Sequence, residues 1–387
     1  MLQVFQRLFN GYQEVQIKNQ NRFFPSTRLT EFIDQIHSKQ CFKYSVVGES
    51  ELGNEIYKVS IGNGPIKIMA WSQMHGNEAT GTLALLECFE LIASDKLEDV
   101  WNELSFVCVF MINPDGAAKF TRRNGNNVDI NRDAQASKAL ETKLLIDQIS
   151  LEKPDVALNL HDQRNIFGVA GFGNPATISF LAPSYNQERE INPCRKKCML
   201  LIAGIAEGLK REIGNCVGKY SDEYYPTAFG EYVQSLGIPC ILIESGAAVA
   251  DPNREVARKM NVYCMFKLFS DLIDNSWKNR SIREYQVIPE NNTDFFDIII
   301  KNVKLEFKGR VESVDLGILI KQELESTVLK NYYQISDLGD LSYKSGLETI
   351  DAFDESQVHK GFELNSLLNL QLPLAKESFV NGLRQNV

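Results

Sequence analysis

Three residues with side chains suited to metal chemistry follow short apolar runs in this chain. His75 and His161 are two of only four histidines, and Glu244 is the third residue. The preceding runs are residues 66–71, 156–160 and 238–243. Each run has the length and composition of a buried strand. Ligands of open α/β sheets bind outside the carboxyl ends of the strands, so we expect these side chains at one rim.

His75 and Glu78 have the spacing H-x-x-E, which a turn entering a helix can bring onto a single ion. Catalytic zinc sites commonly use two histidines and one glutamate, with the fourth position open. The tetrapeptide alone is also consistent with a histidine in a turn and a glutamate stabilised at a helix N-terminus. The hypothesis that His75 and Glu78 bind a metal therefore depends on the other segments of the chain.

The elements that must position these residues alternate along the chain. Strand-like runs at residues 66–71, 104–112, 156–160 and 238–243 are separated by helical patterns at residues 78–93, 137–149, 195–213 and 253–273. Such alternation is typical of a sheet with parallel content and helices on both faces. We predict a three-layer α/β/α fold with a mixed, mostly parallel central sheet. Residues 44–47 and 56–60 are expected to be neighbouring edge strands.

The chain of 387 residues is too long for one ordinary core. We predict a helical N-terminal extension over residues 1–40, a catalytic domain over 41–285, and a small β-rich C-terminal domain with a tail over 286–387. The boundary near 285 follows a polar, irregular stretch, after which the pattern changes to short strands. The sequence does not indicate an oligomeric state.

A net charge of −9 argues against nucleic acid or an anionic membrane as partner. No stretch approaches the roughly 20 apolar residues of a membrane span, and the N-terminus lacks the apolar core of a signal peptide. The eight cysteines are scattered, mostly in apolar stretches. This pattern predicts reduced cysteines in a cytoplasmic protein.

Five segments in one order resemble the zinc metallocarboxypeptidase superfamily, which includes the aspartoacylase and succinylglutamate desuccinylase-like deacylases. They span residues 66–245. The segments are His75-Gly76-Asn77-Glu78, Asn113-Pro114-Asp115-Gly116, the stretch from Arg122 to Arg132 with its Val128-Asp129-Ile130-Asn131-Arg132 end, Asn159-Leu160-His161-Asp162, and residues 238–244, which end in Glu244. The first forty residues and everything after about residue 280 lie outside the resemblance.

The resemblance implies a role for each matching residue. It implies that His75, Glu78 and His161 hold Zn²⁺, with Asp129 accepting a hydrogen bond from His75. Arg122 matches the arginine that stabilises the oxyanion. Asn131 and Arg132 match the pair that binds the terminal carboxylate of the substrate. Glu244 matches the general base.

Several positions depart from the family pattern. Asn77 stands where the digestive carboxypeptidases have arginine, and H-G-N-E is shared with the deacylase branch. Asn127 replaces a usual glycine, but asparagine tolerates a positive φ, so the turn is expected to survive. The mobile tyrosine of the family has no clean match, and Tyr225 is our candidate for it.

These residues predict a zinc-dependent hydrolase that cleaves an amide or peptide bond next to a free carboxylate. Two alternatives remain: an N-acyl amino acid deacylase of the aspartoacylase-like type, and an inactive relative that binds carboxylate ligands. A peptide or an N-acyl amino acid would be the substrate. The sequence lacks the G-x-S-x-G of serine hydrolases and the G-x-x-x-x-G-K of phosphate-binding loops.

Overall fold

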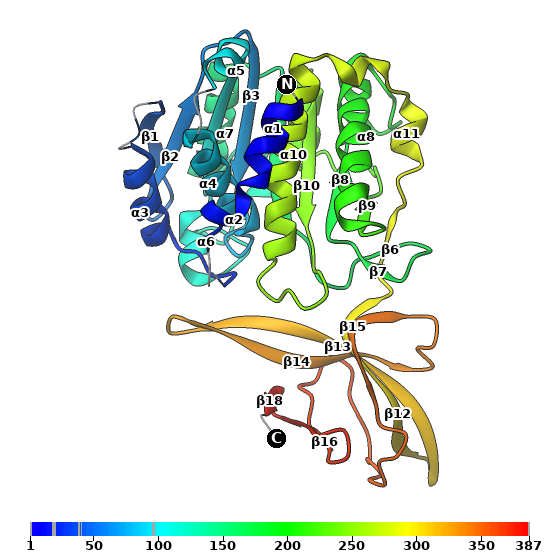
Figure 1. Cartoon of the computed structure of the whole chain (residues 1–387). Helices are drawn as coiled ribbons and strands as arrows, with labels where there is room; N and C mark the ends of the chain where they lie inside the picture. Colours follow the sequence, from blue (N-terminus) through cyan, green and yellow to red (C-terminus); the bar gives the residue numbers. More distant parts are fainter. Residues whose placement is uncertain (1, 18–20, 38, 40, 95–96, 386–387) are drawn as a thin grey trace.

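An eight-stranded mixed sheet forms the centre of the computed structural model, which describes all residues except 1, 18–20, 38, 40, 95–96 and 386–387. The strand order is β1-β2-β4-β3-β5-β10-β8-β9 (Figure 1). The strands are Lys43–Glu49 (β1), Glu55–Ile61 (β2), Ile66–Ser72 (β3), Leu104–Phe110 (β4), Val156–Asp162 (β5), Ile178–Leu181 (β8), Val217–Lys219 (β9) and Cys240–Ser245 (β10).

Four neighbouring strands, β4, β3, β5 and β10, are parallel to one another. Antiparallel pairs lie to either side, where β2 pairs with β4 and β8 pairs with β10. Strand β1 forms one edge, and β9 pairs in parallel with β8 at the other. The expected mixed, mostly parallel sheet is confirmed. The expectation that residues 56–60 form an edge strand is wrong, because β2 is paired on both sides.

Helices cover both faces of this sheet. Helices α4 and α10 pack against each other on one face, and α8 and the N-terminal α1 pack on α10 (Figure 1). Helices α7 and α9 contact strands β3 and β10 on the other face. The helices of the main body are Leu2–Asn10 (α1), Tyr12–Val15 (α2), Ser26–His37 (α3), Thr80–Ala93 (α4), Glu98–Glu103 (α5), Pro114–Lys119 (α6), Leu140–Glu152 (α7), Pro193–Ile213 (α8), Phe229–Ser235 (α9), Glu255–Ile273 (α10) and Ile282–Gln286 (α11), with 3₁₀ turns at Ile130–Arg132 (η1) and Ser276–Asn279 (η2).

Alternation along β3 divides the apolar side chains between two cores. Ile68 and Ala70 belong to the larger core, which includes α1, α4, α8 and α10, whereas Met69 and Trp71 face α7 and α9. Successive residues of a strand point to opposite faces, so a run that is apolar throughout fills both cores. The three-layer α/β/α architecture is thus confirmed.

The C-terminal part of the chain forms smaller sheets. Four strands in the order β14-β13-β12-β15 form one sheet, and β16, β17 and β18 form another. These strands are Phe295–Phe307 (β12), Arg310–Glu325 (β13), Val328–Gly339 (β14), Ser345–Asp351 (β15), Leu370–Leu372 (β16), Glu377–Val380 (β17) and Leu383–Gln385 (β18). The short strand Asn291–Asn292 (β11) pairs with Gly168–Val169 (β6), which pairs with Asn174–Pro175 (β7) of the main body.

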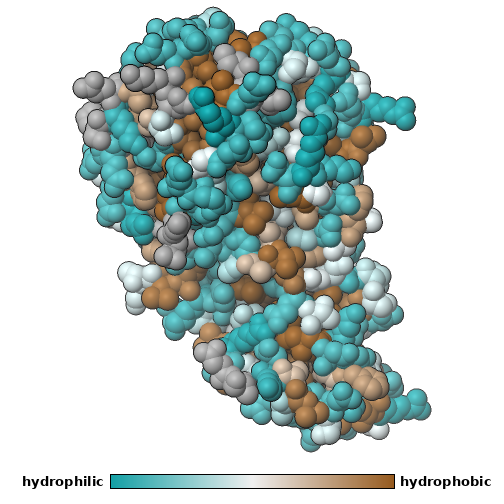
Figure 2. Space-filling model, in the orientation of Figure 1, coloured by the Kyte–Doolittle hydropathy of each residue, from teal (hydrophilic) through white to brown (hydrophobic). Residues whose placement is uncertain are grey.

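The long β13–β14 hairpin runs beneath one edge of the main body (Figure 1). Figure 2 shows hydrophobic residues at the waist between the two parts, on a face that is otherwise mostly hydrophilic. In the described part of the chain, no helix is both long and apolar enough to cross a membrane.

Helix α4 approaches β5 closely at Gly81, next to the strand end that carries His161. A Cβ built on Gly81 would lie 2.6 Å from Leu160 Cβ. We predict that Gly81→Val lowers the free energy of unfolding by about 1–3 kcal/mol, because the overpacked side chain must push helix and strand apart.

Urea denaturation followed by circular dichroism measures this change. The exposed helical substitution Ala118→Val is the control, and it should stay within about 0.5 kcal/mol of the native chain. Equal stability of Gly81→Val and Ala118→Val would contradict the tight helix–strand contact.

Candidate metal centre

The functional side chains gather where β3, β5 and β10 end. The parallel register places Glu244 opposite His161, and Ser72 at the end of β3 opposite Leu160. Paired residues of neighbouring strands point to the same face, so Glu244 and His161 lie side by side. His161 and Glu244 are within their strands, near the ends, whereas His75 lies three residues beyond β3. The rim expected from the sequence is present.

A tight turn brings Glu78 back beside His75. The Glu78 amide donates a hydrogen bond to the His75 carbonyl (3.1 Å) before α4 begins at Thr80. Gly76 within this turn faces the backbone of α6, where a Cβ would lie 2.0 Å from the Gly116 carbonyl carbon. The turn therefore fits only when glycine occupies this position.

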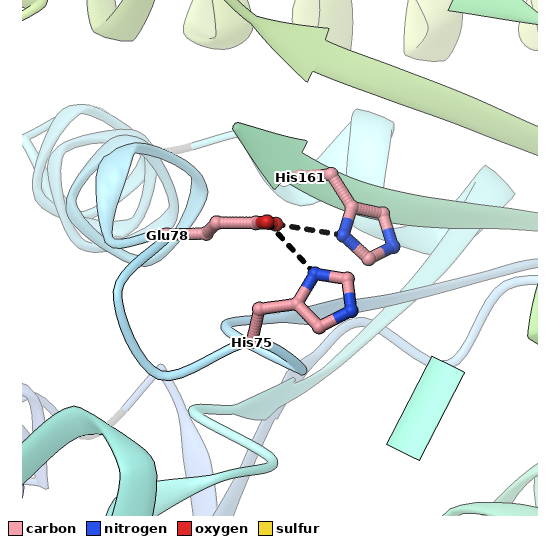
Figure 3. Close-up of side chains that lie close together, drawn as sticks. All are labelled: His75, Glu78 and His161. Carbon is pink, nitrogen blue, oxygen red and sulfur yellow. Dashed lines mark hydrogen bonds and ion pairs between the residues drawn. The ribbon is translucent and has the colours of Figure 1, made fainter. Parts of the chain in front are cut away.

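The side chains of His75, Glu78 and His161 converge in the rim (Figure 3). One potential ligand atom from each lies within 4.8 Å of the others, and all three residues are buried. Each carboxylate oxygen of Glu78 faces a different imidazole. Its Oε1 is 2.8 Å from His75 Nδ1, and its Oε2 is 2.8 Å from His161 Nδ1.

Asp129 fixes the orientation of the His75 ring. Its Oδ1 lies 3.2 Å from His75 Nε2, and its Oδ2 accepts a hydrogen bond from Arg122 Nε at 2.9 Å. With a proton on Nε2, the His75 ring donates to Asp129 and keeps the Nδ1 lone pair for a metal. Burial alone raises the pKa of Asp129, but His75 and Arg122 outweigh it and hold that pKa well below its usual value.

The donor set fits zinc. Two imidazole nitrogens and one carboxylate are the ligands of a common catalytic zinc site, and the Asp129–His75 hydrogen bond is the usual support for such a ligand. Burial alone lowers the pKa of His75, but the carboxylates of Glu78 and Asp129 outweigh it and raise that pKa. Burial lowers the pKa of His161.

Glu244 stands beside this cluster with one carboxylate oxygen unsatisfied. Its Oε2 is buried and has no hydrogen-bond partner among the described residues. Burial, followed by the charges of Glu78 and Asp162, raises the pKa of Glu244 well above its ordinary value. A buried carboxylate without a partner is costly in a purely structural role, so its position favours a chemical one.

Asn131 and Arg132 lie in η1, directly after Asp129, whose Oδ1 caps this turn by accepting from the Asn131 amide (3.0 Å). The Asn131 side-chain oxygen accepts a hydrogen bond from the Phe229 amide at the start of α9 (2.9 Å). Arg132 is exposed and lies over the ring of Tyr225, 5.8 Å from its centroid. The preceding turn includes Asn127 at φ +62°, so the expected positive φ is confirmed.

One cleft of about 680 Å³ is lined by His75, Glu78, Arg122, Asn131, Arg132 and Glu244, but not by Asp129, His161 or Tyr225. Tyr225 is 48% exposed and donates a hydrogen bond to Glu223 outside the cleft. Tyr220, which no motif in the sequence marks, lines the cleft instead, and its ring contacts Phe167. Burial and the charges of Glu244 and Glu78 raise the pKa of Tyr220.

Further cleft residues come from distant parts of the chain. Arg22 reaches it from the N-terminal segment, Arg164 from the loop after β5, and residues 319–322 from β13. No local motif marks Arg22 or residues 319–322 as site residues, because only the tertiary arrangement of three chain segments brings them to the cleft.

Residues 29–163 match the sequence model of a family described as zinc carboxypeptidase. This range includes His75, Glu78, Asp129, Arg132 and His161. No curated protein sequence matches the chain. The resemblance to zinc carboxypeptidases that the sequence predicted is therefore confirmed over this range.

The fold is similar to that of several solved structures. A metallo-carboxypeptidase from Burkholderia cenocepacia has a TM-score of 0.53 at 13% identity, over 65% of this chain and 70% of that one. Carboxypeptidase A from Helicoverpa armigera has a TM-score of 0.52 at 14% identity, over 72% and 81%. Bovine thrombin-activatable fibrinolysis inhibitor, solved with a tick carboxypeptidase inhibitor, has a TM-score of 0.53 at 10% identity, over 65% and 98%.

The raised pKa of His75 predicts how zinc affinity changes with pH. The proton on His75 must leave before its Nδ1 can bind a metal. Zinc binding should therefore weaken by about tenfold per pH unit, for each displaced proton, as the pH falls below this raised pKa. Competition with a chromophoric chelator between pH 5 and pH 9, a range chosen to bracket the ordinary histidine value of about 6.5, measures the effect.

Asp129→Asn removes the carboxylate whose hydrogen bond helps to raise the His75 pKa, so zinc binding should begin to weaken at a lower pH. At high pH, this variant should bind zinc about 10–100-fold more weakly, because the His75 ring loses its carboxylate partner. The exposed Asp147→Asn serves as the control. Identical pH curves for all three proteins would contradict the role of Asp129.

Proposed function

We propose, from the match of residues 29–163 to zinc carboxypeptidases, that this chain is a zinc-dependent hydrolase of amide or peptide bonds next to a free carboxylate. The observation that carries the proposal is the convergence of His75, Glu78 and His161 within 4.8 Å of one another. They lie at a cleft that is lined by His75 and Glu78 and also by Glu244, Arg122 and Arg132. A structural cluster would not need a second, unsatisfied carboxylate beside the first.

In this proposal, zinc would be held by His75 Nδ1, the Glu78 carboxylate and His161 Nδ1. A zinc ion in such a site supplies Lewis acidity, which polarises a carbonyl and lowers the pKa of water to about 7. Glu244 takes the proton from the attacking water and passes it to the leaving amine. The raised pKa of Glu244 suits both steps, because a base must be able to hold the proton before it returns it.

Arg122 stabilises the negative charge that develops on the carbonyl oxygen. Its Nη1 lies 3.6 Å from Glu78 Oε1 and 3.2 Å from His75 Nδ1, so its positive charge lies next to the proposed zinc ligands. Asp129 holds the other edge of the guanidinium through Nε. An arginine fixed in this way needs little reorganisation when charge develops in the transition state.

Arg132 and Asn131 bind the free carboxylate of the substrate. Arg132 is exposed at the cleft, and its planar fork suits bidentate binding of a carboxylate. The Phe229 amide fixes the Asn131 side chain through its oxygen, which leaves the amide nitrogen to donate. Tyr225 stacks on Arg132 and would position it, whereas Tyr220 lines the cleft and is our candidate for a direct contact with substrate.

The substrate is a peptide C-terminus or an N-acyl amino acid, since both present an amide bond next to a carboxylate. We also propose a reducing, cytoplasmic setting. All eight cysteines are free, and five of them are buried in the cores. The opposing possibility is a chain that binds carboxylate ligands without hydrolysing them.

Glu244→Gln should lower kcat by about 10²–10⁴, because the attacking water loses its base. Zinc content should stay at the native level, since Glu244 is not among the proposed ligands. Release of free amino acids from matched sets of short peptides and N-acyl amino acids measures the activity. Hydrolysis of the acyl set alone would indicate a deacylase. A zinc-loaded native protein that binds both sets and cleaves neither would contradict hydrolysis.

The two arginines should affect different kinetic constants. Arg132→Ala should raise KM about 10–100-fold, because a charge-assisted bond to the substrate carboxylate is lost in ground state and transition state alike. Arg122→Ala should instead lower kcat about 10²–10³-fold. Steady-state kinetics with Arg123→Ala as control separate these effects, since the Arg123 side chain bonds only the Asn127 carbonyl among the described residues. An increase in KM alone for Arg122→Ala, equal to that for Arg132→Ala, would contradict the separate role of Arg122, and an unchanged KM for Arg132→Ala would contradict the role of Arg132.

A further inference from the structure

A second cavity lies beside α8, apart from the cleft at the metal centre. Its volume is about 230 Å³, and its walls come from α8, β9, the segments around α11 and the connection between β6 and β7 (Figure 1). Among the described residues, none lines both this cavity and the cleft. The cavity is therefore separate from the proposed active site.

The floor of the cavity is apolar and held in place. It is made by buried side chains of α8, β9 and the segment after α11, namely Ala203, Ala206, Val217 and Ile288. Lys219 of β9 joins two of these walls, because its Nζ donates a hydrogen bond to the Ile288 carbonyl (2.6 Å). A ligand that enters a preformed floor of this kind does not have to order the protein first.

An aromatic ring stands at the cavity and remains partly in water. Phe172 lines the cavity but is 45% exposed, and Val287, which also lines it, is 67% exposed. Phe172 lies between Gly171 (φ +81°) and Gly173 (φ +64°), both in the left-handed region that glycine adopts without strain. The Phe172 amide donates to the Val169 carbonyl (3.2 Å), so the turn holds Phe172 in this position. A ligand that covers Phe172 and Val287 would remove apolar surface from water.

The charged side chains of the lining leave one cation without a partner. Arg280 donates to Glu207 of α8 (2.6 Å) and to Glu284 of α11 (2.8 Å). Glu207 also accepts a hydrogen bond from Arg211, so both acidic residues of the lining are paired. Lys210 lines the cavity, is exposed and forms no ion pair with another described residue. The ligand charge that complements this lining is therefore negative.

The volume limits the size of the ligand. An apolar cavity of about 150 Å³ holds benzene, so a cavity of about 230 Å³ accommodates one ring with a short chain. We propose that this cavity is a second ligand site, for a small apolar carboxylate of about the size of 3-phenylpropanoate. The apolar group lies against Ala206 and Phe172, and the carboxylate lies next to Lys210. This inference does not rest on the proposed function.

Calorimetric titration with 3-phenylpropanoate tests the site. The carboxylate of this probe would also suit Arg132, so the titration uses the full chain carrying Arg132→Ala. The amine 3-phenylpropylamine has the same ring and the opposite charge, and it should bind at least about threefold more weakly because it meets Lys210. Propanoate lacks the ring and should bind at least about tenfold more weakly, because it covers little apolar surface.

Two substitutions in the Arg132→Ala chain locate the bound probe. Ala206→Phe fills the floor of the cavity and should weaken binding of 3-phenylpropanoate at least about tenfold. Lys210→Gln removes the unpaired cation and should lower the preference for the carboxylate over the amine about threefold. Lys196→Gln, exposed near the start of the same helix, is the matched control and should change neither value.

Each outcome decides for or against the site. Binding of 3-phenylpropanoate with this dependence on ring, charge and substitution would support it. No binding, equal affinity for the carboxylate and the amine, or binding that Lys210→Gln and a folded Ala206→Phe chain leave unchanged would overturn it. Lys210→Gln alters only an exposed side chain, so the test stays decisive if Ala206→Phe does not fold.

Light scattering tests a different occupant of the cavity. The proposal predicts that Ala206→Phe leaves the oligomeric state of the native chain unchanged. A native dimer that Ala206→Phe converts to a monomer would show that a second copy of the chain covers the cavity, and would contradict the ligand site.

Discussion

The convergence of two imidazoles on a single buried carboxylate is the constraint on which the rest of the site depends. Glu78 places one oxygen against each histidine at 2.8 Å, with little access to water. If no metal is bound, protons must lie between the Glu78 oxygens and the histidine nitrogens. With neither metal nor protons, the carboxylate oxygens and the nitrogen lone pairs would repel one another. The tight turn at Gly76 and the ring orientation set by Asp129 both serve this geometry, and each would be an odd feature of a purely structural cluster.

Much of this site could be predicted from the sequence, because the relevant signals are local. The H-x-x-E spacing fits a turn of fixed length, and buried parallel strands read as continuous apolar runs that end at the functional residues. The strand ends then meet at one rim by topology alone. The same reasoning wrongly placed residues 56–60 at an edge of the sheet. The sequence of a seven-residue strand with one exposed end does not reveal that the strand pairs with a neighbouring strand on each side.

The residues that the sequence did not reveal share one property: they reach the cleft only through tertiary contacts. Arg22 is separated from Gln322 by 300 positions, and its environment consists of groups from other segments. Tyr220 and Tyr225 are five residues apart in an irregular stretch, where no periodicity indicates which ring faces inward. The domain division near residue 285 stays a prediction, although Asp297 accepts hydrogen bonds from Asn165, which follows β5, and from the Ile320 amide of β13, so the C-terminal sheet is joined to the rim.

The most direct measurement of the central claim is anomalous diffraction at the zinc edge from crystals of the protein purified without added chelator. The account predicts one strong peak at about 2.0–2.2 Å from His75 Nδ1, His161 Nδ1 and a Glu78 oxygen, which are normal zinc distances. A peak elsewhere in the molecule, or coordination through the Nε2 atoms with Glu78 left unbound, would contradict it.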